Sequence, residues 1–474
     1  MGFSITPPIF HNLTLRTLFF FMIKIELNNK ITLRGVPAGI VNILEEELIV
    51  DNPNYLDAQT RGRVTVGIPK QIKLLKYNKK GDHYTLPKGY YYKLIEMLRD
   101  KDYTIDNRQP TLKSIPIEFK GKLKRDQLRA GMLILNRSYG VLKAPTGSGK
   151  TIITLWVIAR RSVPTLIVVH TKELMYQWKE KIQQFLTTEP NQIGLIGDGH
   201  REFKDITISI VNSLTKIDIG EFAGQVIVDE CHRVPSTTFS NAVGKINTNH
   251  LLGLTATDKR SDKLDLLIFH YMGGLIHEIK PKSLQEKGRI LKPKLRVVKT
   301  GFYYPMKGIY ERRPMLQKMV DDQKRNSIIL REVRERIKKY PRGVALVISD
   351  RIDHCKYLFG SLENEGSELL TGNTPSKQRR EVIGRLQAGA SKVLVATGQL
   401  IGEGFDLPSL SSIFLTFPIK FSGRLQQYIG RIVRVMEGKD NPIIYDFSDS
   451  CWYLQHSLRK RMEHYEEMEI LEDI

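Results

Sequence analysis

The sequence predicts an α/β protein with two tandem, doubly wound parallel-sheet domains and a small N-terminal α/β accessory domain. Apolar, strand-like runs alternate with helical segments from about residue 120 to 280, and the alternation returns from about 325 to 450. Most of these runs are continuous, which is typical of a parallel sheet covered by helices on both faces. A chain of 474 residues is long enough for roughly three domains.

The domain boundaries follow from where this alternation starts and stops. We expect an accessory domain over 22–110, domain 1 over 111–280, a connecting region over 281–325, and domain 2 with a C-terminal helix over 326–474. The runs expected as buried strands are 166–169, 206–211, 226–228 and 251–254 in domain 1, and 344–348, 393–396, 413–416 and 443–445 in domain 2.

Residues 1–21 precede Met22 and are expected to be a dispensable extension, with a short internal strand as the alternative. The apolar stretch 13–25 is shorter than the roughly twenty residues that cross a bilayer, and no small-residue cleavage site follows it. The three cysteines lie far apart and form neither a disulfide framework nor a metal cluster. We therefore expect a cytoplasmic protein without membrane contact.

The accessory domain begins with an alternating stretch over 22–35, and the runs 64–69 and 72–77 are further strand candidates. Residues 90–98 have helical spacing. The pair Lys79-Lys80 and the run of tyrosines at 90–92 suit a DNA contact, which is the role we expect, but a packing module explains them equally well.

The charge of the chain favours a polyanionic partner over a small neutral substrate. The net charge is +22, and residues 281–342 alone hold 19 Lys or Arg against 6 Asp or Glu. Four aromatic residues interleave with this charge, at 302–304 and 310. Stacking on bases together with phosphate neutralisation is one interpretation, and a solvated linker with a helix face is the other.

The chemistry centres on residues 141–151, VLKAPTGSGKT, in which an apolar strand runs into a Gly-rich loop and then an apolar helix. In such a loop, backbone N–H groups close on phosphate oxygens and the helix dipole adds positive charge. Lys150 can reach the outer phosphates, and Thr151 can ligate Mg²⁺. The expected nucleotide-contacting residues are Pro145, Thr146, Gly147, Ser148, Gly149, Lys150 and Thr151.

A second motif, Ile227-Val228-Asp229-Glu230-Cys231-His232, ends an apolar run on two acids. In a doubly wound sheet, the carboxyl end of a strand is the ligand edge. Asp229 would therefore hold Mg²⁺, and Glu230 would orient or deprotonate the attacking water.

These motifs together resemble the superfamily 2 DExH-box helicases, whose domains are RecA-like. By this resemblance Gln127 reads adenine, and Thr171, Lys172 and Ser213 touch a nucleic-acid backbone. In domain 2, Arg351 and Thr397 would add strand contacts, while Gly404 and Asp406 would lie near the nucleotide. Arg431 and Arg434, three residues apart, are expected on one helical face as finger arginines that complete the site.

Within the superfamily, the segments 193–199 and 285–291 resemble phage branch-migration helicases of the UvsW type. The resemblance implies an ATP- and Mg²⁺-dependent DNA helicase that tracks a single strand across both domains. It also implies forked or junction DNA substrates in replication, recombination or repair. A duplex translocase, an RNA helicase, a nucleotide-gated DNA-binding protein and a small-molecule phosphotransferase are the alternatives, and we expect a monomer.

Overall fold

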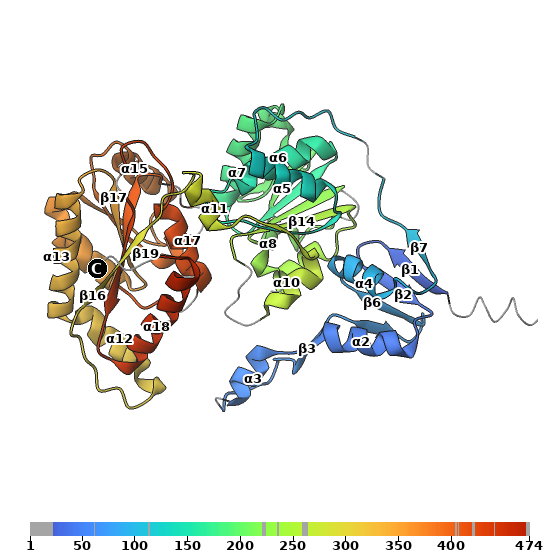
Figure 1. The fold of residues 1–474 in the computed structure, drawn as a ribbon, viewed down its shortest axis with the longest axis horizontal. Helices are drawn as coiled ribbons and strands as arrows, with labels where there is room; N and C mark the ends of the chain where they lie inside the picture. The colour runs from blue at the N-terminus through green and yellow to red at the C-terminus, as the bar shows by residue number, and fades with distance from the viewer. Residues whose placement is uncertain are drawn as a thin grey trace, which may run out of the picture.

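The predicted fold class is confirmed. The computed structural model describes residues 22–60, 62–111, 114–219, 224–234, 237–257, 264–402, 405, 407–419, 422–439 and 441–470. Domain 2 (yellow to red) and domain 1 (teal to light green) lie side by side along the long axis of the molecule, and the accessory domain (blue) lies below domain 1 and to its right in this view (Figure 1).

The accessory domain is a five-stranded sheet in the order β5-β6-β2-β1-β7, in which only the β1–β7 pair is parallel. Alternation over 22–35 produces the β1–β2 hairpin, whose Ile23, Ile25, Ile31 and Leu33 are buried on one face. Its elements are β1 (Ile23–Leu27), β2 (Ile31–Arg34), α2 (Ala38–Leu48), β3 (Ile49–Asp51), α3 (Pro53–Thr60), β4 (Gln71–Lys73), β5 (Lys76–Asn78), β6 (His83–Leu86), η2 (Lys88–Tyr90), α4 (Tyr91–Met97) and β7 (Tyr103–Asn107).

Two strand predictions in this domain were wrong or incomplete. Residues 64–69 form no strand, and Val64 and Val66 remain 78% and 88% exposed. The run 72–77 is divided between β4 and β5, since Leu74 and Leu75 turn into the core between them. The tyrosine run supports the packing alternative: Tyr90 is buried, and the rings of Tyr91 and Tyr92 lie 5.8 and 6.2 Å from that of Tyr139 in domain 1.

Domain 1 is an eight-stranded sheet in the order β11-β10-β12-β9-β13-β14-β8-β15, parallel except for the β10–β11 pair. The four predicted runs are β9, β12, β13 and β14. Its elements are α5 (Arg125–Leu135), β8 (Tyr139–Lys143), α6 (Lys150–Arg161), β9 (Thr165–Val169), α7 (Lys172–Phe185), η3 (Pro190–Gln192), β10 (Ile193–Gly197), β11 (His200–Arg201), β12 (Ile206–Ile210), α8 (Val211–Leu214), β13 (Gln225–Asp229), η4 (Cys231–Arg233), α9 (Thr237–Val243), β14 (His250–Thr255), α10 (Asp265–Met272), β15 (Leu275–Glu278) and α11 (Pro281–Glu286).

Domain 2 is a six-stranded, fully parallel sheet in the order β16-β21-β20-β17-β19-β18. Its elements are β16 (Lys294–Lys299), η5 (Ile309–Glu311), α12 (Arg312–Asp321), α13 (Gln323–Lys339), β17 (Val344–Ser349), α14 (Ile352–Ser361), η6 (Glu363–Glu365), β18 (Ser367–Leu370), α15 (Ser376–Gln387), β19 (Val393–Thr397), α16 (Gly398–Gly402), β20 (Leu410–Leu415), α17 (Ser422–Ile432), β21 (Ile443–Ser448) and α18 (Trp452–Glu467).

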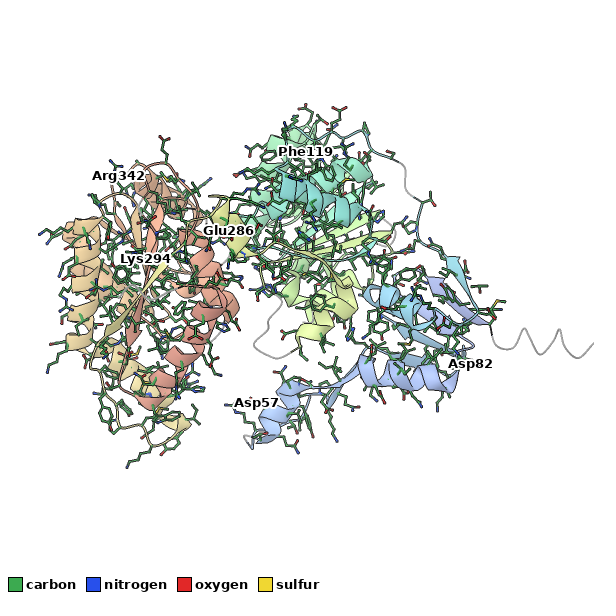
Figure 2. All side chains as sticks on the ribbon, viewed as in Figure 1. Asp57, Asp82, Phe119, Glu286, Lys294 and Arg342 are labelled. Carbon is green, nitrogen blue, oxygen red and sulfur yellow. The ribbon has the colours of Figure 1, made fainter. Side chains whose placement is uncertain are left out.

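The region 281–325 differs from the expected linker because it supplies β16, the edge strand of the domain 2 sheet. Figure 2 shows Glu286, the last residue of α11, between the two larger bodies, and Lys294, the first residue of β16, within domain 2. Of the aromatic residues there, Phe302 is buried, whereas Tyr303 and Tyr310 are exposed. The polypeptide therefore passes between the domains at α11, well before residue 325.

The central parallel strands of both domains are covered on both faces, as their continuous apolar sequences predict. Every residue of β9, β13, β17 and β19 is buried. Cys231, Cys355 and Cys451 are buried free thiols. Across the described residues, no helix combines the length and apolar character that a membrane crossing requires.

Candidate functional site

The predicted phosphate loop joins β8 to α6, which begins at Lys150. Gly147 and Gly149 both have φ of +86°, a left-handed conformation that turns successive N–H groups toward one side. Ser148 is buried, and its Oγ has no hydrogen-bond partner among the described residues. A loop of this shape fits a phosphate group, which would satisfy both the N–H groups and the Ser148 hydroxyl.

Gln127 braces this loop from α5. Its Nε2 donates to the Ser148 carbonyl oxygen at 3.0 Å, while its Oε1 accepts from the Lys124 N–H at 3.0 Å. A Cβ atom on Gly149 would lie 2.4 Å from the same Nε2, and the φ of +86° also disfavours a side chain at this position. Gln127 thus lies at the loop, and adenine reading by this residue stays a prediction.

The two acids lie at the end of β13, with Asp229 as its last residue and Glu230 directly after it, and Glu230 faces Lys150. The Lys150 Nζ lies 3.9 Å from Glu230 Oε1, and both side chains are mostly buried. Glu230 itself has φ of +51°, an uncommon left-handed conformation for a non-glycine residue. The Asp229 carboxylate accepts from the Glu230 N–H at 3.0 Å and from Trp178 Nε1 at 2.9 Å. The structure therefore brings Lys150, Asp229 and Glu230 together, as the motifs predict.

The two carboxyl groups experience opposite electrostatic environments. Burial, and then the charge of Glu230, raise the pKa of Asp229. Burial also acts to raise the pKa of Glu230, but Lys150 and His232 outweigh it and hold that pKa below its usual range. Glu230 is accordingly ionised at neutral pH and can accept a hydrogen bond from a water molecule beside the phosphate loop.

His232 connects Glu230 to β14, a contact that sequence reasoning missed. Its Nδ1 lies 3.3 Å from Glu230 Oε2 and 3.2 Å from Thr255 Oγ1. The Thr255 hydroxyl in turn donates to the Thr257 carbonyl oxygen and accepts from the Thr257 N–H. His232 and Trp178 were visible only as members of motifs. Their partners depend on β13 lying between β9 and β14, an order that the sequence does not give.

Domain 2 reaches the phosphate loop through α17. A Cβ atom on Gly430 would lie 2.7 Å from Thr146 Cβ, so the absence of a side chain permits this close approach. Arg434 forms an antiparallel bridge with Ile290, whose Cγ2 would lie 3.1 Å from a Cβ on Gly147. Residues of both domains therefore pack against the phosphate loop.

The expected placement of both arginines on one helical face was wrong. Arg431 belongs to α17, but the helix ends at Ile432, and Arg434 follows it in an extended bridge. Burial lowers the pKa of Arg434. Their role as finger residues stays a prediction, and Gly404 and Asp406 lie outside the described residues.

The five predicted DNA contacts all lie at carboxyl ends of parallel strands. Thr171 caps α7, its hydroxyl accepting from the Leu174 N–H at 3.3 Å, and Lys172 begins that helix. Ser213 lies in α8 directly after β12, Arg351 follows β17, and Thr397 is the buried last residue of β19. The structure shows this common edge, and contact with a nucleic acid stays a prediction for each of them.

An ion pair joins the two domains at this edge. Arg379 Nη1 of α15 lies 3.0 Å from Glu173 Oε1, next to Lys172 in the first turn of α7. Glu173 lies in the motif that includes Thr171 and Lys172, but Arg379 belongs to no motif, so this pair could not be predicted from the sequence.

The residues beside the phosphate loop suit Mg²⁺ that is bound partly by substrate phosphates, rather than a metal ion that is bound by protein side chains alone. Within the described residues, no group of three His, Cys, Asp or Glu side chains could hold a metal ion. Mg²⁺ is commonly bound by one or two protein oxygens together with substrate phosphates. Thr151, the second residue of α6, and Asp229 can supply such a pair beside the phosphate loop.

Two family models match the sheet domains. Residues 111–260 match the model for the res subunit of type III restriction enzymes, and residues 325–436 match the helicase conserved C-terminal domain. The chain is an ATP-dependent helicase or translocase of superfamily 2. The predicted enzyme class, an ATPase, is thereby confirmed.

Several related proteins extend this similarity. The helicase candidate 161L of Invertebrate iridescent virus 6 is 28% identical over 380 residues, covering 74% of this chain and 82% of that protein. The DNA 3'-5' translocase XPB2 of Sulfurisphaera tokodaii is 25% identical, with coverages of 71% and 84%. The helicase candidate D10 of Escherichia phage T5 is 24% identical, with coverages of 65% and 67%.

The fold recurs among solved structures. S. cerevisiae Dbp5 bound to RNA and ADP BeF3 aligns with a TM-score of 0.53 and 15% identity, covering 74% of this chain and 90% of Dbp5. At this identity the likeness concerns the fold alone.

Proposed function

We propose that this chain is a DNA helicase that uses ATP hydrolysis to translocate on, unwind and branch-migrate forked or junction DNA in phage replication, recombination or repair. The observation that carries the proposal is the shared site, in which Gly430 of domain 2 packs on Thr146 of the domain 1 phosphate loop. A nucleotide in that loop changes the surface that domain 2 contacts.

The chemistry follows from the residues around the loop. Lys150 and the loop N–H groups bind the phosphates, and Mg²⁺ held by Thr151 and Asp229 would neutralise charge on the phosphate oxygens. Glu230, ionised and fixed by His232, orients the attacking water. Arg431 and Arg434 from domain 2 would stabilise charge on the γ-phosphoryl oxygens when the domains close.

Movement along a strand follows from the position of the predicted DNA contacts. Thr171, Lys172 and Ser213 lie on domain 1, while Arg351 and Thr397 lie on domain 2. Closure of the two domains would therefore change the distance between the two sets of DNA contacts. Each cycle of closure and hydrolysis would then move domain 2 one step relative to domain 1 on a single strand.

The relative XPB2 supports DNA as the nucleic acid. XPB2 is named as a DNA 3'-5' translocase, and the net charge of +22 suits a phosphate backbone. We extend the 3'-5' polarity to this chain as part of the proposal. A translocase that moves on duplex DNA without extended unwinding, or an RNA helicase, would use the same ATP site.

One assay set separates these functions. ATP hydrolysis and strand displacement are measured on a fork, a four-way junction, 3' and 5' overhangs and an RNA duplex, with Lys150→Ala as the inactive control. We expect DNA-stimulated hydrolysis, migration of the junction and a requirement for the 3' overhang. Stimulation by RNA alone, or hydrolysis indifferent to DNA, would overturn the proposal.

A further inference from the structure

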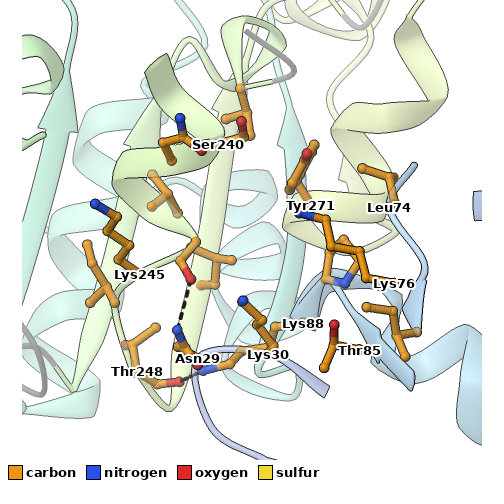
Figure 3. Close-up of a pocket in the computed structure, with 18 of the residues that line it drawn as sticks. Asn29, Lys30, Leu74, Lys76, Thr85, Lys88, Ser240, Lys245, Thr248 and Tyr271 are labelled. Atoms are coloured by element: carbon orange, nitrogen blue, oxygen red, sulfur yellow. Dashed lines mark hydrogen bonds between the residues drawn. The ribbon is translucent and has the colours of Figure 1, made fainter. Parts of the chain in front are cut away.

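A cavity lies between the accessory domain and domain 1, away from the phosphate loop. It has a volume of about 280 Å³ and is open to solvent (Figure 3). One wall comes from the β1–β2 turn and from β4 to η2, and the other comes from the end of α9, the start of β14 and Tyr271 of α10. Two distant segments of sequence therefore build one site.

The lining of this cavity is strongly basic. Lys30, Lys73, Lys76, Lys88 and Lys245 line it, and none of the lining residues is Asp or Glu. None of the five ammonium groups makes an ion pair with a carboxylate of the part of the chain that the structure describes. Figure 3 shows Lys30 and Lys88 close together, with Lys76 on one side of them and Lys245 on the other. Five such charges repel one another unless an anion lies among them.

Lys88 is the buried member of this set. It is 4% exposed, and its Nζ donates to the Thr248 carbonyl oxygen at 2.8 Å. An ammonium group has three N–H donors and can offer the others to a ligand. Burial without a compensating carboxylate lowers the pKa of Lys88 to about 7, so a negatively charged ligand would stabilise the protonated form.

One residue of the cavity wall belongs to the segment that follows the catalytic acids. Val234 lines the cavity, and its N–H donates to the Cys231 carbonyl oxygen at 2.9 Å in the turn that begins at Glu230. On the opposite wall, Asn29 Nδ2 donates to the Gly244 carbonyl oxygen at 3.2 Å and fixes the accessory domain to α9. A ligand in the cavity would therefore touch both the accessory domain and the segment that carries the catalytic acids.

We propose that this cavity binds phosphate groups, and that their source is the backbone of the DNA on which the enzyme acts. Lysines act as flexible point charges and suit sequence-independent phosphate contacts. Four of the five are exposed, so a continuous strand can reach them, and Lys88 is buried. A free nucleotide carries the same phosphate chemistry and is the competing source. The inference rests on the proposed function for its choice of DNA.

The test compares two triple variants of equal charge change. Lys30→Glu, Lys76→Glu and Lys245→Glu alter the cavity, whereas Lys24→Glu, Lys70→Glu and Lys101→Glu alter exposed lysines of the accessory domain outside it. Affinity for a fluorescent DNA duplex is measured by anisotropy between 0.05 and 0.3 M salt. Each phosphate contact contributes roughly 0.9 to the salt slope, so we expect the cavity variant to lose two to three units of slope and roughly 100-fold in affinity.

The control variant should lose no more than about 5-fold, because distant exposed charges are screened. Equal losses in both variants, or unchanged affinity in the cavity variant, would overturn the inference. Lys88→Met, which keeps the apolar stem, should lower DNA affinity without lowering Tm. A lower Tm with unchanged affinity would instead assign Lys88 a purely structural role.

A nucleotide arm identifies the source of the phosphate. ATP binding is measured by equilibrium dialysis on the Lys150→Ala chain with and without the cavity substitutions. We expect no ATP binding that depends on the cavity. Residual ATP binding that the cavity substitutions abolish, with DNA affinity unchanged, would overturn the DNA assignment. Hydrolysis by the unaltered chain that ignores DNA would overturn the proposed function instead, and the anisotropy result would still decide the cavity.

Discussion

Domains 1 and 2 share a parallel-sheet architecture but use their buried charges differently. In domain 2, Arg461 makes two hydrogen bonds to Asp446, at 2.7 and 2.8 Å, and Tyr465 adds a third at 2.9 Å. In domain 1, Lys150 lies 3.9 Å from Glu230, outside hydrogen-bond range. The difference teaches that charges tightly bonded to one another hold a structure, whereas loosely paired charges at a strand end are available to a ligand.

The largest effect should come from the loosely paired charges of domain 1. Lys150→Ala and Glu230→Gln remove phosphate binding and water orientation, so kcat should fall roughly 10²- to 10⁴-fold. Tm should stay close to that of the unaltered chain, since neither side chain holds the fold. If these variants lost much of their Tm but kept their activity per folded molecule, the charges of domain 1 would be structural, and the contrast with domain 2 would be wrong.

Arg434→Ala should have the next largest effect on the reaction. The guanidinium would act on the γ-phosphoryl oxygens only in the closed state, so kcat should fall about 10²- to 10³-fold with nucleotide affinity preserved. Single-turnover hydrolysis and ATP binding separate the two quantities. A loss confined to binding would argue against the finger role.

Arg461→Met should affect stability rather than chemistry. It leaves Asp446 buried without its cation, so the free energy of unfolding should fall by about 3–5 kcal/mol. Arg385→Met is the matched control, because Arg385 makes a similar two-point contact with Glu368 at the surface. That exposed pair should contribute no more than about 1 kcal/mol. Similar losses in denaturant unfolding would show that burial is not what distinguishes the pairs.

The smallest of these effects should come from His232→Gln. His232 positions Glu230 and connects it to Thr255, so we expect kcat to fall about 10-fold, or about 1.4 kcal/mol. The KM for ATP should stay unchanged and the stimulation by DNA should weaken. A change in KM alone would mean that His232 affects binding and not the coupling.

The local parts of this picture could be read from the sequence. Continuous apolar runs specify buried parallel strands such as β9 and β17, and the Gly-Ser-Gly-Lys spacing specifies the loop because each needs only neighbouring residues. The contacts Trp178–Asp229 and His232–Thr255 could not be read because they depend on strand order. Arg434 was misplaced because helical spacing does not show where a helix ends.

The region 281–325 and the run 64–69 both show that a strand forms only where a partner strand is available. The many charged residues of β16 gave it no apolar strand pattern, so it was not predicted. It forms a strand because it pairs with β21, almost 150 residues later. Conversely, 64–69 has a strand-like composition but no partner strand, so it forms none.

The most direct test of the central claim is the steady-state rate of ATP hydrolysis by the unaltered chain and by Glu230→Gln, each with and without a four-way DNA junction. The shared two-domain site predicts that the junction raises the rate of the unaltered chain well above its basal value. It also predicts that Glu230→Gln stays at background in both conditions. A rate that the junction leaves unchanged, or hydrolysis that persists in Glu230→Gln, would contradict a DNA-coupled motor with its catalytic acid at this position.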